Sequence, residues 1–292
     1  MKRDVLPVIL GATVGAYALS HAFFHDYGIV PLVLDEEIPP LFAHTFCAYA
    51  DEIKNLRKGH ILYRVLEDIA GKAQGKSLIL IPSDAHFLSL VKENAEVLEK
   101  LFLIPHLPTP CVEAFADTAE ALVLLYRAGN GECRTVFGRV LAFSPSGSIT
   151  AVLTENIPLN VKEKIEREAQ SLSRGIYLFY LDREGRPHRD GSVLSPLLAF
   201  SAAKDASIPE WLIAETVLCK PLPETQRGLF ALFTVFPYRK TRCFLSRTQR
   251  KTVRGVQKCS LYSYKEEGIR RDIARVFGVL YKAHTQENKP KD

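Results

Sequence analysis

Two polar segments near the N-terminus follow apolar runs and carry side chains that could contact a small ligand. One follows the run at residues 7–10 and the other follows the run at 77–81. The candidate substrate-binding residues are Gly11, Ala12, Thr13, Ser83 and Asp84. In an open α/β sheet, the carboxyl ends of parallel strands face the crevice in which ligands bind. The structural alternative is a tight turn at the first segment and a helix N-cap at the second.

Patterns typical of metal binding are sparse. None of the six cysteines forms a C-x-x-C pair, so a structural zinc site is not expected. Six N-terminal histidines lie outside any zincin-like H-E-x-x-H motif, so each is predicted to be a surface or hydrogen-bonded histidine. They are His21, His25, His44, His60, His86 and His106. In the second half Asp182, Glu184 and Asp190 flank a turn, and Asp190 is the candidate metal ligand; the alternative is ordinary hairpin chemistry.

Three motifs that bind phosphate or activate a nucleophile are absent from the sequence. The turn after the first apolar run has the sequence G-A-T-V-G, in which Thr13 replaces the second glycine of the dinucleotide fingerprint G-x-G-x-x-G. That glycine lets the backbone approach a pyrophosphate, so NAD binding is disfavoured there. Neither a G-x-x-x-x-G-K-[ST] loop nor a G-x-S-x-G elbow occurs. No catalytic residue is assigned from motifs.

The elements that position the first candidate residues begin as a βαβ unit. The predicted order is a strand at Pro7–Leu10, a helix at Val14–Tyr27 capped by Thr13 and ended by Gly28, and a strand at Ile29–Leu34. A further buried strand at Ser77–Ile81 precedes a helix whose apolar face continues to Leu101. Residues 1–108 are therefore predicted to form an α/β, Rossmann-like domain.

The second half is expected to be α+β over residues 109–238. Two antiparallel strands are predicted at Ala121–Arg127 and Cys133–Phe143, around a glycine-rich turn. Asn160 and Glu163 have the spacing of a capping box at the start of a helix. Ser207 is predicted to cap a later helix that runs through residue 218.

Composition and charge describe a globular chain with a basic end. Of 292 residues, 47% are hydrophobic and 24% charged, which excludes disorder throughout. Residues 239–292 carry 15 Lys/Arg against 5 Asp/Glu, although the whole chain has a net charge of only +5. They are predicted to form a basic helical tail whose helix at 270–284 packs on residues 121–218. Its predicted anion-facing residues are Arg270, Arg271 and Arg275.

The N-terminal run at residues 5–24 resembles the start of a signal peptide, but it is polar enough for a strand, turn and helix. A membrane span is not expected, because the run contains Pro7, Gly11 and His21. Together with the scattered cysteines, this predicts a cytoplasmic protein with reduced thiols.

The N-terminal sequence resembles an ATP-grasp carboxylate–amine ligase of bacterial type. Two segments carry the resemblance: PVILGATVGAYALSHAFFHDYGIVPLVLD and, after it, LILIPSDAHFLSLVKENAEVLEKLFLIP. The resemblance is nearest to D-aspartate ligase-like proteins, and Pro82-Ser83-Asp84 and Glu93-Asn94 match that pattern. It covers about the first hundred residues, with a weaker match in the C-terminal half. It implies a Rossmann-like domain before an ATP-grasp region, ATP and Mg²⁺ as cofactors, and acyl-phosphate activation of a small carboxylate that an amine attacks.

The sequence departs from this family in the ATP-binding half. The family's strand of the form hydrophobic–Lys–Pro is missing between Ile104 and Ala121. Where the family's metal-binding Glu-x-Asn should stand, the chain has Arg189-Asp190-Gly191-Ser192. The resemblance therefore implies a relative that is truncated and degenerate in this half. ATP and Mg²⁺ are expected by resemblance only, and the alternative is that neither is bound.

Three functions remain open on the sequence. The first is a carboxylate–amine ligase relative with impaired catalysis. The second is a non-catalytic pseudo-ligase, or pseudoenzyme, that binds substrate or a partner such as a full-length ligase or a second copy of the chain. The third is an anionic-surface or nucleic-acid binder that uses the basic tail. Nucleic acid is the least favoured partner, because only Tyr262 and Tyr264 offer a stacking platform there.

Overall fold

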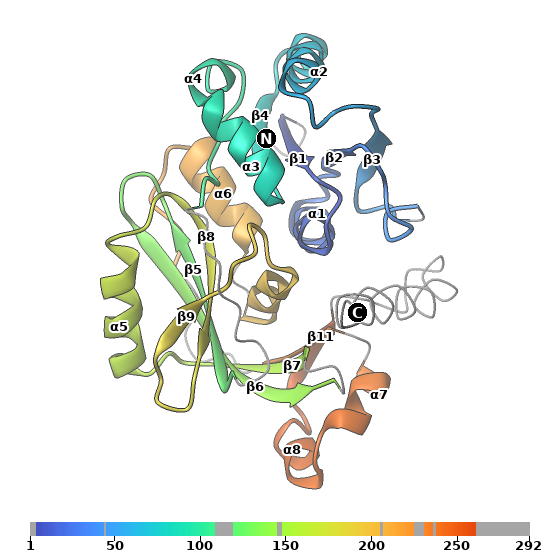
Figure 1. The fold of residues 1–292 in the computed structure, drawn as a ribbon. Helices are drawn as coiled ribbons and strands as arrows, with labels where there is room; N and C mark the ends of the chain where they lie inside the picture. The colour runs from blue at the N-terminus through green and yellow to red at the C-terminus, as the bar shows by residue number, and fades with distance from the viewer. Residues whose placement is uncertain are drawn as a thin grey trace, which may run out of the picture.

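The structure is a computed structural model that describes residues 4–43, 45–108, 119–144, 148–204, 207–224, 231–235 and 238–260. Within these ranges the chain forms two sheets, joined through helices that pack between them (Figure 1). The first has four parallel strands in the order β3-β2-β1-β4, and the second has seven strands in the order β11-β10-β7-β6-β5-β8-β9. This arrangement confirms the predicted α/β class.

The first sheet and its helices occupy residues 5–98. The elements are β1 (Val5–Leu10), α1 (Val14–Tyr27), β2 (Leu32–Asp35), β3 (Tyr49–Glu52), α2 (Gly59–Lys72), β4 (Ser77–Pro82), α3 (Ala85–Glu93) and α4 (Ala95–Leu98). Strand β1 pairs in parallel with both β2 and β4, as the βαβ pattern predicts. The carboxyl ends of these three strands consequently lie together at one edge.

Local capping signals set the ends of the N-terminal helices. The Thr13 hydroxyl accepts a hydrogen bond from the Ala16 N–H at 3.1 Å, and Gly28 ends α1 in the left-handed region at φ 64°. Both features confirm the prediction. The predicted continuous helix through Leu101 is wrong, because Asn94 has non-helical ψ of 17° and φ of −116° and separates α3 from α4.

Helices cover both faces of the first sheet, but in different ways. Side chains of α2 and α3, including Leu66 and Phe87, pack with Val8, Leu10 and Leu80 on one face. On the other face lies α1, half of whose residues are buried. The run of buried residues from Gly15 to Ser20 spans more than one turn, so a second surface must cover part of this helix.

The second sheet supplies that surface through its own helices. Its elements are β5 (Ala121–Arg127), β6 (Cys133–Phe143), β7 (Ile149–Glu155), α5 (Leu159–Ala169), β8 (Gly175–Leu181), β9 (Pro187–Arg189), η2 (Pro196–Lys204), α6 (Ile208–Thr216), β10 (Ala231–Thr234), α7 (Tyr238–Thr241), η3 (Arg242–Phe244), α8 (Arg247–Thr252) and β11 (Gln257–Ser260). Helix α5 covers one face of the sheet, whereas α6 and η2 lie on the other and contact α1 (Figure 1). One continuous core therefore joins the regions predicted as two domains.

The predicted hairpin pairs as expected, from Ala121 opposite Arg139 to Arg127 opposite Cys133. Ser207 caps α6 by accepting the Glu210 N–H, which is also confirmed. The predicted capping box at Asn160 is wrong. The N-cap of helix α5 lies two residues earlier, at Pro158, whose fixed φ suits that position, and the helix begins at Leu159.

The structure places the start of the predicted basic tail within the second sheet. Strand β11 pairs in parallel with β10, and Leu245 and Val253 from the preceding segment are buried against β7 and β10 residues. The predicted helix at 270–284, with its anion-facing Arg270, Arg271 and Arg275, lies outside the described residues.

None of the helices in the described ranges combines the length and the apolar character that crossing a membrane requires.

Candidate functional site

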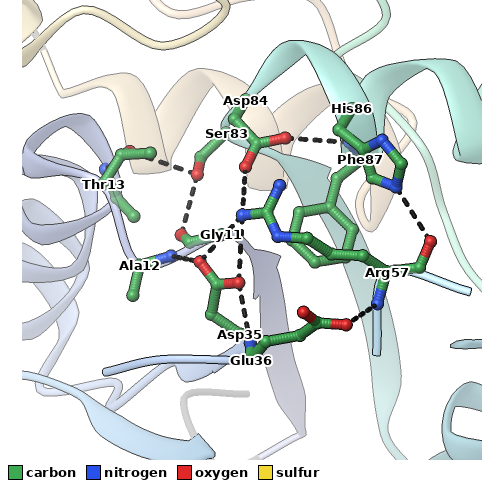
Figure 2. A network of polar contacts seen from close by, with 11 residues as sticks. Gly11, Ala12, Thr13, Asp35, Glu36, Arg57, Ser83, Asp84, His86 and Phe87 are labelled. Carbon is green, nitrogen blue, oxygen red and sulfur yellow. Dashed lines mark hydrogen bonds and ion pairs between the residues drawn. The ribbon is translucent and has the colours of Figure 1, made fainter. Parts of the chain in front are cut away.

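The five predicted crevice residues lie together at the carboxyl edge of the first sheet (Figure 2). This follows from strand order, because β1 lies between β2 and β4, with Leu10 opposite both Leu34 and Pro82. The turn after β1 and the Ser83-Asp84 step after β4 therefore meet above the ends of the strands.

Short hydrogen bonds link the two predicted segments. The Ser83 hydroxyl donates to the Gly11 carbonyl at 2.7 Å, and the Thr13 hydroxyl donates to the Ser83 oxygen at 3.1 Å. Gly11 has a φ of 97°, and a Cβ at this position would lie 2.6 Å from the Ser83 oxygen. Only glycine fits this turn, for both conformational and steric reasons.

Two charged residues that the sequence analysis did not select complete the site. Asp35, at the end of β2, accepts the Ala12 N–H at 2.9 Å and is 8% exposed. Arg57, in the segment before α2, donates to Asp35 at 3.0 Å and to Asp84 at 2.8 Å. The position of Asp35 at a strand end is a signal that could have identified it. No local pattern marks Arg57.

The Arg57 side chain is fixed from several directions. Its guanidinium carbon lies 4.7 Å from the centroid of the Phe87 ring, and its backbone N–H donates to Glu36 at 2.9 Å. The His86 ring nitrogen lies 2.8 Å from the Arg57 carbonyl. Burial lowers the pKa of Arg57, but the hydrogen bonds and charges of Asp84 and Asp35 outweigh it and raise the pKa above its usual value. The guanidinium stays charged and spans the crevice between two carboxylates.

Each predicted crevice residue thus has a hydrogen-bond partner within the chain, through its backbone at Gly11 and Ala12 and through its side chain at Thr13, Ser83 and Asp84. Asp84 also accepts the Phe87 N–H at 2.9 Å, as the N-cap of α3. A ligand that enters between the strand ends must therefore compete with Arg57 for Asp35 and Asp84. An anionic ligand would likewise have to displace Asp35 and Asp84 from Arg57, since both carboxylates already pair with its guanidinium.

Asp190 lies in the second half, after β9, and is 7% exposed. The Tyr180 hydroxyl donates to one of its oxygens at 3.1 Å, and the Ser192 N–H donates to the other at 2.9 Å. Burial and the neighbouring Asp190 charge raise the pKa of Tyr180, so this hydroxyl keeps its proton and its hydrogen bond.

These contacts do not fit a magnesium ion. Mg²⁺ is held in proteins mainly by carboxylate oxygens and waters, and both Asp190 oxygens already accept hydrogen bonds. Within the described ranges, Asp190 belongs to no cluster of three or more His, Cys, Asp or Glu ligand atoms. The cluster found there is formed instead by His21, His25 and Cys47.

A groove of about 750 Å³ opens on the second sheet, at the β8–β9 turn and beside β6. Its charged lining residues are Glu120, Arg139, Asp182, Arg183, Glu184 and Arg186. Ion pairs join Arg186 to Asp182 at 2.8 Å and Arg183 to Glu120 at 3.6 Å. The signs balance, so the groove lacks the excess positive charge that would attract a nucleoside triphosphate.

No protein-family model and no curated protein matches this chain. Solved structures do match its fold. The ADP complex of an N5-carboxyaminoimidazole ribonucleotide synthetase aligns with a TM-score of 0.52 and 10% identity, over 78% of this chain and 81% of that one. The ADP complex of N5-carboxyaminoimidazole synthetase from Staphylococcus aureus aligns with a TM-score of 0.51 and 10% identity, again over 78% and 81%.

These two enzymes are ATP-grasp ligases, and this chain shares their fold. The fold is what the likeness establishes, because identity is only 10% and one fold supports many functions.

Proposed function

We propose that the protein is an ATP-grasp carboxylate–amine ligase relative whose catalysis is impaired. The D-aspartate ligase-like proteins are the proposed nearest group, with the ATP-binding half of the chain truncated and degenerate. The intact reaction would activate a small carboxylate as an acyl phosphate, which an amine then attacks.

The observation that carries the proposal is the Arg57 bridge across the crevice. In a fold shared with ADP-binding ligases, the strand-end crevice is where a small carboxylate would be expected. Here Arg57 is bonded to Asp35 and Asp84, and Ser83 is bonded to the turn after β1. The crevice therefore keeps the ligand-binding location of its fold, but its polar groups are engaged by one another.

The second support is the state of the candidate metal ligand. Asp190 accepts hydrogen bonds on both oxygens and lacks the companion carboxylate–amide pair that the resemblance requires. ATP is proposed as a ligand on the fold alone, and Mg²⁺ has no fitting site among the described residues. Weakened phosphoryl transfer is the consequence, because the metal would offset charge on the transferring group.

Calorimetric titration with ATP, with and without Mg²⁺, tests this function. A ligase relative is expected to bind with a dissociation constant below about 1 mM, which corresponds to about 4 kcal/mol. Release of ADP in the presence of amino-acid mixtures should not rise above the rate without protein. An Asp190→Asn variant serves as a matched control, and its ATP affinity should be unchanged in the presence of Mg²⁺.

Two results would contradict the proposal in different ways. Amine-dependent ADP release over many turnovers would show a working ligase. Absence of ATP binding at 1 mM would remove the ligase class and leave the pseudo-ligase.

A pseudo-ligase subunit that binds a partner is the second candidate, favoured by the exposed edge of the first sheet. Strand β3 is an edge strand, and it presents Tyr49, which is 68% exposed. Val30, which precedes β2, is 40% exposed, and Phe46, which precedes β3, is 50% exposed. Exposed edges and apolar side chains of this kind mark interaction surfaces.

The proposed partner is a second copy of this chain or a full-length ligase with the same N-terminal fold. Sedimentation velocity of the wild type and of Tyr49→Lys tests the first possibility. Concentration-dependent dimers that Tyr49→Lys abolishes would support self-association through β3. A wild type that remains monomeric at all concentrations would exclude self-association and leave the ligase as the partner to be tested.

A further inference from the structure

We propose that His21, His25 and Cys47 form a binding site for a zinc ion on the outer side of α1. One ring nitrogen of each histidine and the Cys47 sulfur all lie within 4.8 Å of one another. This cluster is separate from the Arg57 crevice and from Asp190, and it does not depend on the proposed ligase ancestry.

The two histidines are placed by the geometry of the helix. They are four residues apart on α1, so their side chains lie on the same face, one turn apart. Their Nε2 atoms are 3.0 Å apart, and the ring centroids are 4.1 Å apart. Two nitrogens bound to one tetrahedral zinc at the usual bond length would be about 3.4 Å apart. A small rotation of either ring therefore brings both nitrogens to zinc-binding distance.

The cysteine comes from the loop between β2 and β3. Cys47 is completely buried and is not in a disulfide, and its backbone N–H donates to the Thr45 hydroxyl at 3.2 Å. Aromatic contacts hold this loop against α1. Phe46 packs edge-on against Phe24, with ring centroids 5.1 Å apart. The sulfur is therefore positioned beside the histidines by packing before any metal arrives.

A second aromatic contact supports the same loop from its other end. Phe42 is 4% exposed and packs edge-on against Tyr17 of α1, with ring centroids 5.8 Å apart. The segment around Cys47 is thus fixed to α1 at two points about two turns apart, Tyr17 and Phe24. Less conformational entropy is lost on metal binding when the ligands are already held close together.

The donor set selects the metal. Two imidazoles and one thiolate suit zinc, which is commonly four-coordinate with nitrogen and sulfur ligands, whereas Mg²⁺ and Ca²⁺ prefer oxygen. His25 is exposed and His21 is half-buried, so a fourth position on the ion faces solvent and would hold water. Zinc would connect the β2–β3 loop to α1. It would replace the contact between the two ring nitrogens, and its binding would require Cys47 to be a thiolate.

The test is zinc binding by the full-length chain in competition with a chromophoric chelator, under reducing conditions. The wild type is expected to bind one tight equivalent. Cys47→Ser, His21→Gln and His25→Gln should each weaken that equivalent by at least about tenfold. With Co²⁺ in place of zinc, a thiolate-to-metal charge-transfer band should appear in the wild type and be absent from Cys47→Ser.

Two exposed residues outside the cluster supply matched controls. His60→Gln and Cys219→Ser make the same chemical changes at exposed positions and should leave zinc affinity and the cobalt band unchanged. Because Cys47 is buried, its serine variant could lose stability; the exposed His25→Gln variant tests the site without that complication. Zinc affinity that is equal in the wild type, Cys47→Ser and His25→Gln would overturn the proposal, since binding would then reside at other ligands. A cobalt band that persists in Cys47→Ser would overturn it as well.

Discussion

The backbone of Gly15 in α1 lies directly against the carbonyl group of Leu194. A Cβ at Gly15 would fall 1.9 Å from the Leu194 oxygen and 2.7 Å from its carbonyl carbon. Leu194 precedes η2 and belongs to the core that also contains α6 residues such as Trp211 and Leu212. This close approach of two backbones lies where α1 meets the second half of the chain.

Gly15→Ala is therefore expected to destabilise the protein by about 1–3 kcal/mol, the usual range for overpacking a core. Alanine is the better helix former, so helix propensity alone would predict the opposite sign. The measurement is chemical denaturation followed by fluorescence of Trp211, the only tryptophan, which is 1% exposed. Gly71→Ala in α2, where a Cβ would meet nothing within 4 Å, is the control and should leave stability unchanged or slightly higher.

Lowering the pH should make the folded state less stable because of His106. This side chain is fully buried, accepts the Ile176 N–H at 3.1 Å and lies 2.8 Å from the Val193 carbonyl. Burial lowers the pKa of His106 to about 4. The unfolded chain binds a proton near pH 6.5, so the unfolded state gains the proton first as pH falls. This contribution is present above about pH 6.5 and is lost as pH falls towards 4.

We expect a loss of about 2 kcal/mol in the free energy of unfolding between pH 7 and pH 5 from this residue. His106→Asn should be less stable at pH 7 and should show a shallower pH dependence over the same interval. His60→Gln, at an exposed position, is the control. Parallel pH profiles for His106→Asn and the wild type would show that His106 is not the titrating group.

The Arg57–Asp84 ion pair should have a measurable but modest coupling energy. Its side chains are 35% and 23% exposed, so solvent screens part of the attraction. A double-mutant cycle with Arg57→Gln and Asp84→Asn should give about 0.5–1 kcal/mol. Asparagine remains a good N-cap for α3, so the cycle isolates the charge.

The exposed pair of Lys72 and Asp68 provides the comparison for that cycle. These side chains are 76% and 59% exposed, and Lys72→Gln with Asp68→Asn should show coupling near zero. Equal coupling energies for the two pairs would contradict the special position assigned to Arg57.

Removal of residues 1–108 should leave a remainder that does not unfold cooperatively. The truncation strips α1 from α6 and η2 and exposes core side chains that include Phe200 and Trp211. Loss of buried apolar surface lowers stability roughly in proportion to the area exposed. Thermal melting followed by circular dichroism is the measurement, and a soluble fragment with a sharp transition would refute the shared core.

Features that depend on neighbouring residues could be predicted from the sequence. The caps at Thr13 and Ser207, the ending of α1 at Gly28 and the hairpin of β5 and β6 all involve residues close in the chain. The predicted parallel strands also put the Gly11 turn and Ser83-Asp84 at the carboxyl edge of the first sheet. These predictions succeed because local geometry and hydrophobic periodicity act over a few residues.

Contacts between distant segments were decided only by the tertiary structure. Arg57 is 22 and 27 residues from the carboxylates that it joins, and no pattern marks it. His21 and His25 had helical spacing in the sequence, but their cluster with Cys47 depends on the path of the β2–β3 loop across α1. The common core of α1 and α6 likewise joins residues nearly two hundred positions apart. The physical reason is that packing of whole elements sets these distances, and the residues that meet carry no local record of their partners.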